Sequence, residues 1–198
     1  MPTLSWMTTA SAETADPLSH TALRARIAWL CHLTRAAAAG WAAWVLIAVV
    51  WTWSDPAKIV STVGHYLNTE LGMISPFEFI WAFGVNVAIW IPDAAVAYCI
   101  WRLFGTYLDG HIFTADAAAW MQRTGVTGLI AVLASIVGRR IDWLILTSHA
   151  ELPLSTRLFT QFVVPVDLLQ VLFCLFLLAI GHVFRTAVQI ANDHASIV

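Results

Sequence analysis

Four long apolar runs constrain this chain more than any other feature of its sequence. A helix needs about 20 mostly apolar residues to cross the roughly 30 Å hydrocarbon core of a bilayer, because each residue adds about 1.5 Å. The runs that meet this length cover residues 36–53, 79–103, 125–146 and 162–184. Strands of a membrane barrel would instead alternate in polarity over about ten residues. We therefore expect an all-α integral membrane protein built as a four-helix bundle.

The amino-acid composition is that of a protein surrounded by lipid. Hydrophobic residues make up 60% of the 198 residues and charged residues only 11%, whereas a soluble domain is about half apolar and roughly a quarter charged. A formal net charge of −2 gives no indication of direct nucleic-acid binding. The three cysteines, Cys31, Cys99 and Cys174, are far apart and form no CxxC motif, so we expect neither a disulfide nor a metal cluster.

Basic residues beside the apolar runs predict the orientation. Six of them would lie on one side, namely Arg24, Arg26, Arg35, Arg102, Arg123 and Arg185. The opposite side has Lys58 and Arg157 in its loops, with Arg139 and Arg140 near a helix end. This asymmetry predicts a multi-pass protein of the bacterial inner membrane with both termini in the cytoplasm. The polar start of the chain does not resemble a cleavable signal peptide.

Three further segments are expected to be short helices outside the spans. Residues 21–35 mix arginines with leucines, which is typical of an amphipathic helix along the inner interface. Residues 56–71 follow Asp55, a suitable N-cap, and begin with Pro56. Residues 115–123 follow a second N-cap, Thr114. The expected organisation is a cytoplasmic segment at 1–35, a transmembrane domain at 36–185 and a cytoplasmic tail at 186–198.

Ionisable residues inside the apolar runs are the first candidates for function or packing, because they are costly in a bilayer. Arg139 and Arg140 lie roughly 22–24 Å along their helix, which is roughly 6–8 Å from the outer edge of the hydrocarbon. Asp167 enters from that edge and lies about 7–8 Å deep. The matching depths predict an ion pair of Asp167 with one of the two arginines, and Asp142 could share Arg139 on the same helix face. This cluster is either a packing clamp or a polar vestibule open to the outer side.

Asp93 is expected near the middle of the bilayer, about 15 Å from the inner end of its helix. Asn86, Ala82 and Ala97 extend its stripe of small or polar side chains, which suits a helix–helix contact. Ser135 is expected at a similar depth. Two interpretations remain open: a protonated Asp93 hydrogen-bonded within the bundle, or a site that responds to protons or cations.

The last apolar run carries one polar or small face. Its members, at helical spacing, are Asp167, Gln170, Cys174, Gly181 and Arg185. Such a face is typical of the buried side of a bundle. The sequence contains no HExxH, GxSxG or Walker motif. We therefore expect no catalytic residues, no metal site and no cofactor.

The run from Trp101 to Thr114 resembles a motif of bacterial four-helix membrane proteins, the YoaS-like family of unknown function. The pattern is LF-x-x-Y-x-x-G-x-(I/V)-F-T, and the residues that fill it are Leu103, Phe104, Tyr107, Gly110, Ile112, Phe113 and Thr114. The chain's last residues also resemble the closing helix of that family, although Asn192, Asp193 and His194 replace its usual acidic run. The resemblance implies the four-helix topology and no chemistry. From the residues themselves, Gly110 permits a turn, Phe113 can anchor at the interface and Thr114 can cap a helix.

Two functions are compatible with these features. The first is a non-enzymatic sensor, regulatory partner or assembly component, acting as a homo-oligomer or through a protein partner such as a cytoplasmic regulator. The second is a small oligomeric transporter or ion channel whose path uses Asp93 and Asn86. In both, the lipid bilayer is the surrounding medium.

Overall fold

The structure is a computed structural model that describes residues 17–67, 75–109, 114–148 and 164–195. The described residues are entirely helical and form five helices without a strand. The bounds of the helices are α1 Pro17–Thr52, α2 Pro56–Leu67, α3 Pro76–Leu108, α4 Ala115–Leu146 and α6 Pro165–Ala195. The all-α expectation is therefore confirmed for the described part of the chain.

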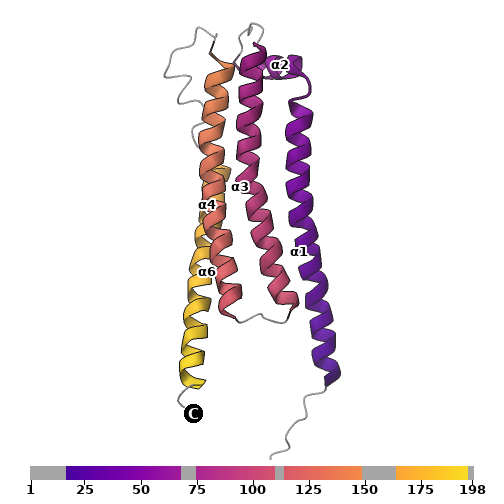
Figure 1. The fold of residues 1–198 in the computed structure, drawn as a ribbon, viewed down its shortest axis with the longest axis vertical. Coiled ribbons are helices and arrows are strands. Elements are labelled where there is room, and N and C mark those ends of the chain that lie inside the picture. The colour runs from indigo at the N-terminus through magenta and orange to yellow at the C-terminus, as the bar shows by residue number, and fades with distance from the viewer. Residues whose placement is uncertain (1–16, 68–74, 110–113, 149–163, 196–198) are drawn as a thin grey trace, which may run out of the picture.

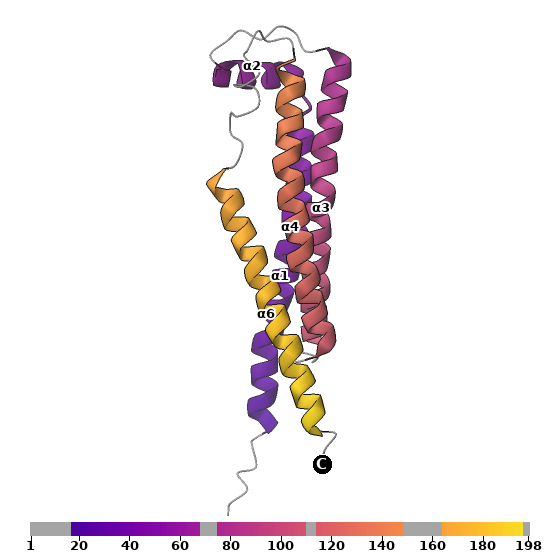
Figure 2. The same ribbon diagram turned by 90° about the vertical axis from the view of Figure 1, so that its left-hand side faces the viewer.

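The four long helices run side by side, and α2 lies across one end of them (Figure 1). Helix α1 packs on α3, α3 on α4, and α4 on α6. Helix α6 leans away from α4 toward the α2 end, while α1 and α6 extend past α3 and α4 at the opposite end (Figure 2). The start of α1 and the end of α6 lie at that same opposite end.

Within the described residues, three helices contain segments long and apolar enough to cross a membrane: Ala28–Thr52 in α1, Pro76–Leu108 in α3 and Pro165–Ile190 in α6. The expected span at 125–146 does form a helix, α4, but α4 is not one of these three. Its apolar run is interrupted by Arg139, Arg140 and Asp142. Four spans therefore remain a prediction, whereas the described part of the chain contains three membrane-length apolar helices.

The predicted helix starts at Asp55 and Thr114 are confirmed. The Asp55 carboxylate accepts the backbone N–H of Ala57 at 3.1 Å, and α2 begins with Pro56. The Thr114 hydroxyl accepts the backbone N–H of Ala117 at 3.3 Å. Both contacts satisfy a donor that the first turn of a helix leaves free. The expected continuation of α2 beyond Leu67 lies outside the described residues.

Two segments expected as separate short helices are parts of long ones. Residues 21–35 are the N-terminal portion of α1, and residues 115–123 are the first turns of α4. Four consecutive alanines, 36–39, follow the first segment, and alanine is the strongest helix former. In α4 the helix continues through Gly125, which packs directly against Leu178 of α6. No helix-breaking residue separates either segment from the run that follows it.

Small residues form the helix contacts, and large apolar side chains cover the outside. Buried positions include Ala82, Ala117, Ala118, Gly125 and Gly128. Trp41, Trp44, Trp51 and Phe77 are among the exposed large residues. Close approach of backbones at small residues is characteristic of helix packing in lipid, and an apolar exterior of this extent would be unfavourable in water.

Candidate functional site: a cavity around Asp93

A partly open cavity of about 710 Å³ lies at mid-height among the four long helices. Helix α1 contributes Trp41 to its lining, α3 contributes Asp93, α4 contributes Ser135, and α6 contributes Gln170 and Phe173. The remaining lining residues are Thr34, Ala37, Ala38, Val96, Ala97, Ile100, Gly128, Ala131, Val132, Leu169 and Cys174. The site is therefore mainly apolar, with a few polar groups from different helices.

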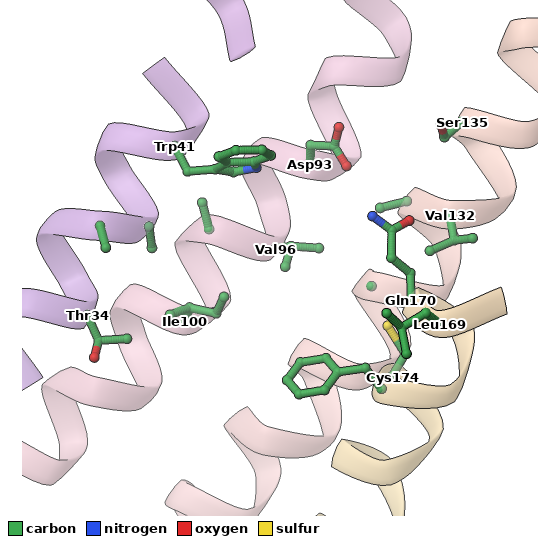
Figure 3. A pocket seen from close by; sticks show the side chains of 16 residues that line it. Thr34, Trp41, Asp93, Val96, Ile100, Val132, Ser135, Leu169, Gln170 and Cys174 are labelled. Atoms are coloured by element: carbon green, nitrogen blue, oxygen red, sulfur yellow. The ribbon is translucent and has the colours of Figure 1, made fainter. Parts of the chain in front are cut away.

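Asp93 is the most unusual member of this lining. Among the described residues its carboxylate has neither a hydrogen-bond donor nor an ion-pair partner. In Figure 3 the Asp93 carboxylate and the Gln170 amide extend into the same space, and Trp41 extends toward it from α1. Pro92 immediately precedes Asp93 inside α3, where proline removes one backbone N–H donor from the helix ladder. The carboxylate thus faces open volume in the middle of an apolar site.

The predicted ion pair between α4 and α6 is present, and Arg139 is the arginine that forms it. Arg139 Nη2 donates to Asp167 Oδ2, and the same oxygen accepts the backbone N–H of Val164 at 3.0 Å. Asp167 is only 3% exposed. A buried carboxylate is stable only when charged or hydrogen-bonding groups satisfy it. This pair ties the start of α6 to α4, and Arg140 lies next to it in the chain.

The expectation that Asp142 shares Arg139 is wrong. Asp142 Oδ2 instead accepts a hydrogen bond of 2.6 Å from Asn86 Nδ2, which also donates to the carbonyl of Ala82 at 3.0 Å. Asn86 therefore links α3 to α4 and is not part of the cavity lining. The stripe predicted along α3 is divided: Ala82 and Asn86 serve the α3–α4 contact, whereas Asp93 and Ala97 face the cavity.

The sequence indicated the cavity-lining residues of α3, α4 and α6, but it did not indicate those of α1. Asp93, Ser135, Gln170 and Cys174 were expected at similar depths or on one face, and all four line the cavity. Trp41 and its neighbours were not expected there, because an apolar run without charges gives no indication of which side of its helix faces a site. Packing of α1 on α3 brings them to the cavity.

The motif residues that the structure describes have packing roles. Thr114 caps α4, and the Tyr107 ring contacts that of Phe104 with 5.6 Å between centroids. Tyr107 and Thr114 also line a crevice of about 10 Å³ against Phe184 of α6, which has room for about one water molecule. Gly110 and Phe113 lie outside the described residues. Within the described ranges, no three His, Cys, Asp or Glu side chains are grouped to hold a metal ion.

Helical architecture, three membrane-length apolar helices and a mid-height cavity together define the class: a helical protein of the kind that resides in membranes. Comparison with protein-family models, curated proteins and solved structures finds no match to this chain.

Proposed function

We propose that this chain is a non-enzymatic, multi-pass membrane protein that acts as a ligand-responsive sensor or regulatory protein. The observation that supports this proposal is the 710 Å³ cavity, which α1 and α6 line from different sides. Its volume falls within the range of about 300–1,000 Å³ that is usual for small-molecule sites. Apolar walls with a few convergent polar groups are also typical of such sites.

In this proposal α4 is a fourth membrane span. It has 32 residues, enough to cross a bilayer, and it packs between α3 and α6. The charged groups near its end have partners on both neighbours, Asp167 for Arg139 and Asn86 for Asp142. Pairing of this kind lowers the free-energy cost of placing ionisable side chains inside a bilayer.

The proposed location is a bacterial inner membrane with both ends of the chain in the cytoplasm. The start of α1 and the end of α6 lie at one end of the bundle, which supports placing them on the same side (Figure 1). Arg35 and Arg102 belong to that half of the bundle and lie over tryptophan rings, Trp101 and Trp120 respectively. Basic residues at the cytoplasmic interface follow the usual charge asymmetry of membrane proteins. Membership of the YoaS-like family stays a prediction.

A ligand in the cavity would act on the separation between α1 and α6. Helix α1 packs on α3 and α6 packs on α4, while no comparable interface joins α1 to α6 in the described part of the chain. Their separation can therefore change without disrupting the α3–α4 contact. Both helices extend past the bundle at the end that holds the termini (Figure 2). A ligand that binds one spacing better than another would shift the population toward it, and a cytoplasmic partner or a second copy would detect the change.

A cavity-filling substitution tests this coupling without knowledge of the ligand. Val96→Trp adds bulk inside the cavity, and Val137→Trp adds the same bulk at a position that is 56% exposed and outside it. Spin labels at Leu33→Cys on α1 and Gln189→Cys on α6 occupy exposed positions and report the helix separation by electron–electron double resonance. The parent chain with its three buried native cysteines, labelled in parallel, gives the background.

The sensor proposal expects Val96→Trp to shift the distance distribution between positions 33 and 189, with no shift for Val137→Trp. If the distance distribution of Val96→Trp is the same as that of the unmodified chain, the result would count against coupling between the cavity and the cytoplasmic ends.

A small oligomeric transporter is the second candidate, supported by the carboxylate of Asp93 at mid-height without a partner in the described residues. Transport sites in membrane proteins often lie near the bilayer midplane. Proton-coupled flux in liposomes that is lost in Asp93→Asn, but retained in the exposed control Asp116→Asn, would favour transport over sensing. Liposomes that show no flux with the unmodified chain would remove this candidate.

A further inference from the structure

We infer that the cavity binds a lipophilic organic cation, a molecule whose positive charge is carried on an apolar body. This inference rests on the proposed ligand-binding function and names the chemical class of the ligand. Three features of the cavity carry it: one unpartnered carboxylate, aromatic walls and a shortage of other oxygen ligands.

The charge of the site comes from one residue. Asp93 is the single Asp, Glu, Lys, Arg or His side chain in the described lining. Asp142 of α4 and Asp167 of α6 lie outside the lining and already have donors, because Asp167 pairs with Arg139 and Asp142 with Asn86. No described basic side chain lines the cavity or forms an ion pair with Asp93. An anionic ligand would be repelled, and a cationic one would supply the missing partner.

The walls favour an organic cation over a metal ion. Trp41 and Phe173 line the cavity from α1 and α6 with 64% and 59% of their surfaces exposed. Tryptophan and phenylalanine rings attract ammonium and related cations through their π faces. The other polar lining groups are the side chains of Thr34, Ser135 and Gln170. Divalent cations such as Ca²⁺ require about six to eight oxygen ligands, and the described lining does not bring that many oxygen atoms together.

The cavity also has a route from the bilayer. It is partly open, and it lies between α1 and α6, which lack a packed interface with each other in the described residues. An amphiphilic cation partitions into the bilayer and can enter sideways between these two helices. Its apolar body would replace lipid contacts along Val96, Ile100 and Leu169, while its charge reaches Asp93.

The experiment uses the full chain in lipid nanodiscs and radiolabelled tetraphenylphosphonium as the probe. Tetraphenylborate has nearly the same shape and the opposite charge, so it separates charge recognition from apolar fit. The variant Asp93→Asn removes the charge with little change of size. Asp116→Asn is the matched control, since Asp116 is exposed in the first turn of α4 and outside the cavity. Ala38→Trp fills the cavity and retains Asp93.

We expect saturable binding of tetraphenylphosphonium to the unmodified chain and to Asp116→Asn. Binding to Asp93→Asn should weaken at least about tenfold, the effect of losing one charge–charge attraction worth about 1.4 kcal/mol. Ala38→Trp should also reduce binding, and tetraphenylborate should not compete. Helical content measured by circular dichroism shows whether each variant remains folded. If Asp93→Asn does not fold, the comparison of the two probes and the Ala38→Trp variant still decide the outcome.

The inference is overturned if tetraphenylphosphonium fails to bind saturably, if Asp93→Asn binds it as tightly as the parent, or if tetraphenylborate competes equally. An uncharged probe, triphenylmethanol, shows whether only the cation inference has failed or whether the proposed ligand-binding function has failed as well. Saturable binding of triphenylmethanol that Ala38→Trp abolishes would leave a ligand site without cation selectivity. Absence of binding by all three probes, together with an unchanged distance in Val96→Trp, would overturn both.

Discussion

Arg139 of α4 and Asp167 of α6 form an ion pair in which the same carboxylate oxygen also accepts the backbone N–H of Val164. One side chain thus both joins two helices and satisfies a free donor at the start of α6. The contact lies in the first turn of α6, at the end where α6 leans away from the other helices (Figure 2). It fixes this end of α6, while the cavity below it remains partly open.

The first prediction concerns this ion pair. Asp167→Ala should lower the free energy of unfolding by about 1.5–3 kcal/mol, because a charge-assisted hydrogen bond is lost and two donors are left without their acceptor. Unfolding in mixed micelles with increasing sodium dodecyl sulfate measures the change. Asp116→Ala, an exposed carboxylate in the first turn of α4, should cost at most about 1 kcal/mol. The double variant Arg139→Met/Asp167→Leu should recover part of the loss, because it removes the unpaired arginine although the Val164 N–H still lacks its acceptor. An equal loss in the double variant would contradict the role of the pair.

The second prediction concerns close helix packing at Gly138. A Cβ atom at this position would overlap the side chain of Ile89 in α3. Gly138→Ala should therefore destabilise the protein by about 1–3 kcal/mol through overpacking. Gly84→Ala is the matched control, because nothing lies within 4 Å of its added Cβ, and helix propensity there favours alanine by up to about 1 kcal/mol. Adding Ile89→Ala to Gly138→Ala should relieve the clash; stability that stays unchanged on this addition would argue for another cause.

The third prediction concerns the hydrogen bond between Asn86 and Asp142. A double-mutant cycle with Asn86→Ala and Asp142→Ala should give a coupling energy of about 0.5–1.5 kcal/mol, the usual size for interhelical hydrogen bonds in membranes. Asn86→Ala should leave tetraphenylphosphonium binding unchanged, because Asn86 does not line the cavity. A coupling energy near zero would show that the contact does not join α3 to α4 in the bilayer.

The fourth prediction concerns the attachment of α1 to α3. Trp90 Nε1 donates to the backbone carbonyl of Ala42 at 2.9 Å. Trp90→Phe keeps an aromatic ring and removes the donor, so we expect faster amide exchange in the Ala42 region of α1, corresponding to about 1 kcal/mol of lost local stability. Trp44→Phe is the control, since Trp44 is an exposed residue of α1 itself. Exchange that accelerates equally in both variants would mean that the hydrogen bond does not hold α1 in place.

Positions along each helix could be read from the sequence because the α-helix has a fixed rise per residue. Counting residues from the helix ends put Arg139 and Asp167 at matching depths, and their ion pair forms. The helix starts at Asp55 and Thr114 were equally predictable, because N-capping depends on the local chain and on its own backbone donors.

The tertiary structure decided which side of each helix meets which neighbour. Asn86 and Asp93 are seven residues apart and share a stripe on α3, yet Asn86 meets Asp142 of α4 and Asp93 faces the cavity. Small residues let helices approach closely at points that rotation about each helix axis must bring together, as Gly128 meets Cys174 of α6 and Gly138 meets Ile89 of α3. These are long-range contacts, and a residue count within one helix contains no information about them. The sequence therefore determined the helices and the depth of their charges, whereas packing alone created the cavity and brought Trp41 to its wall.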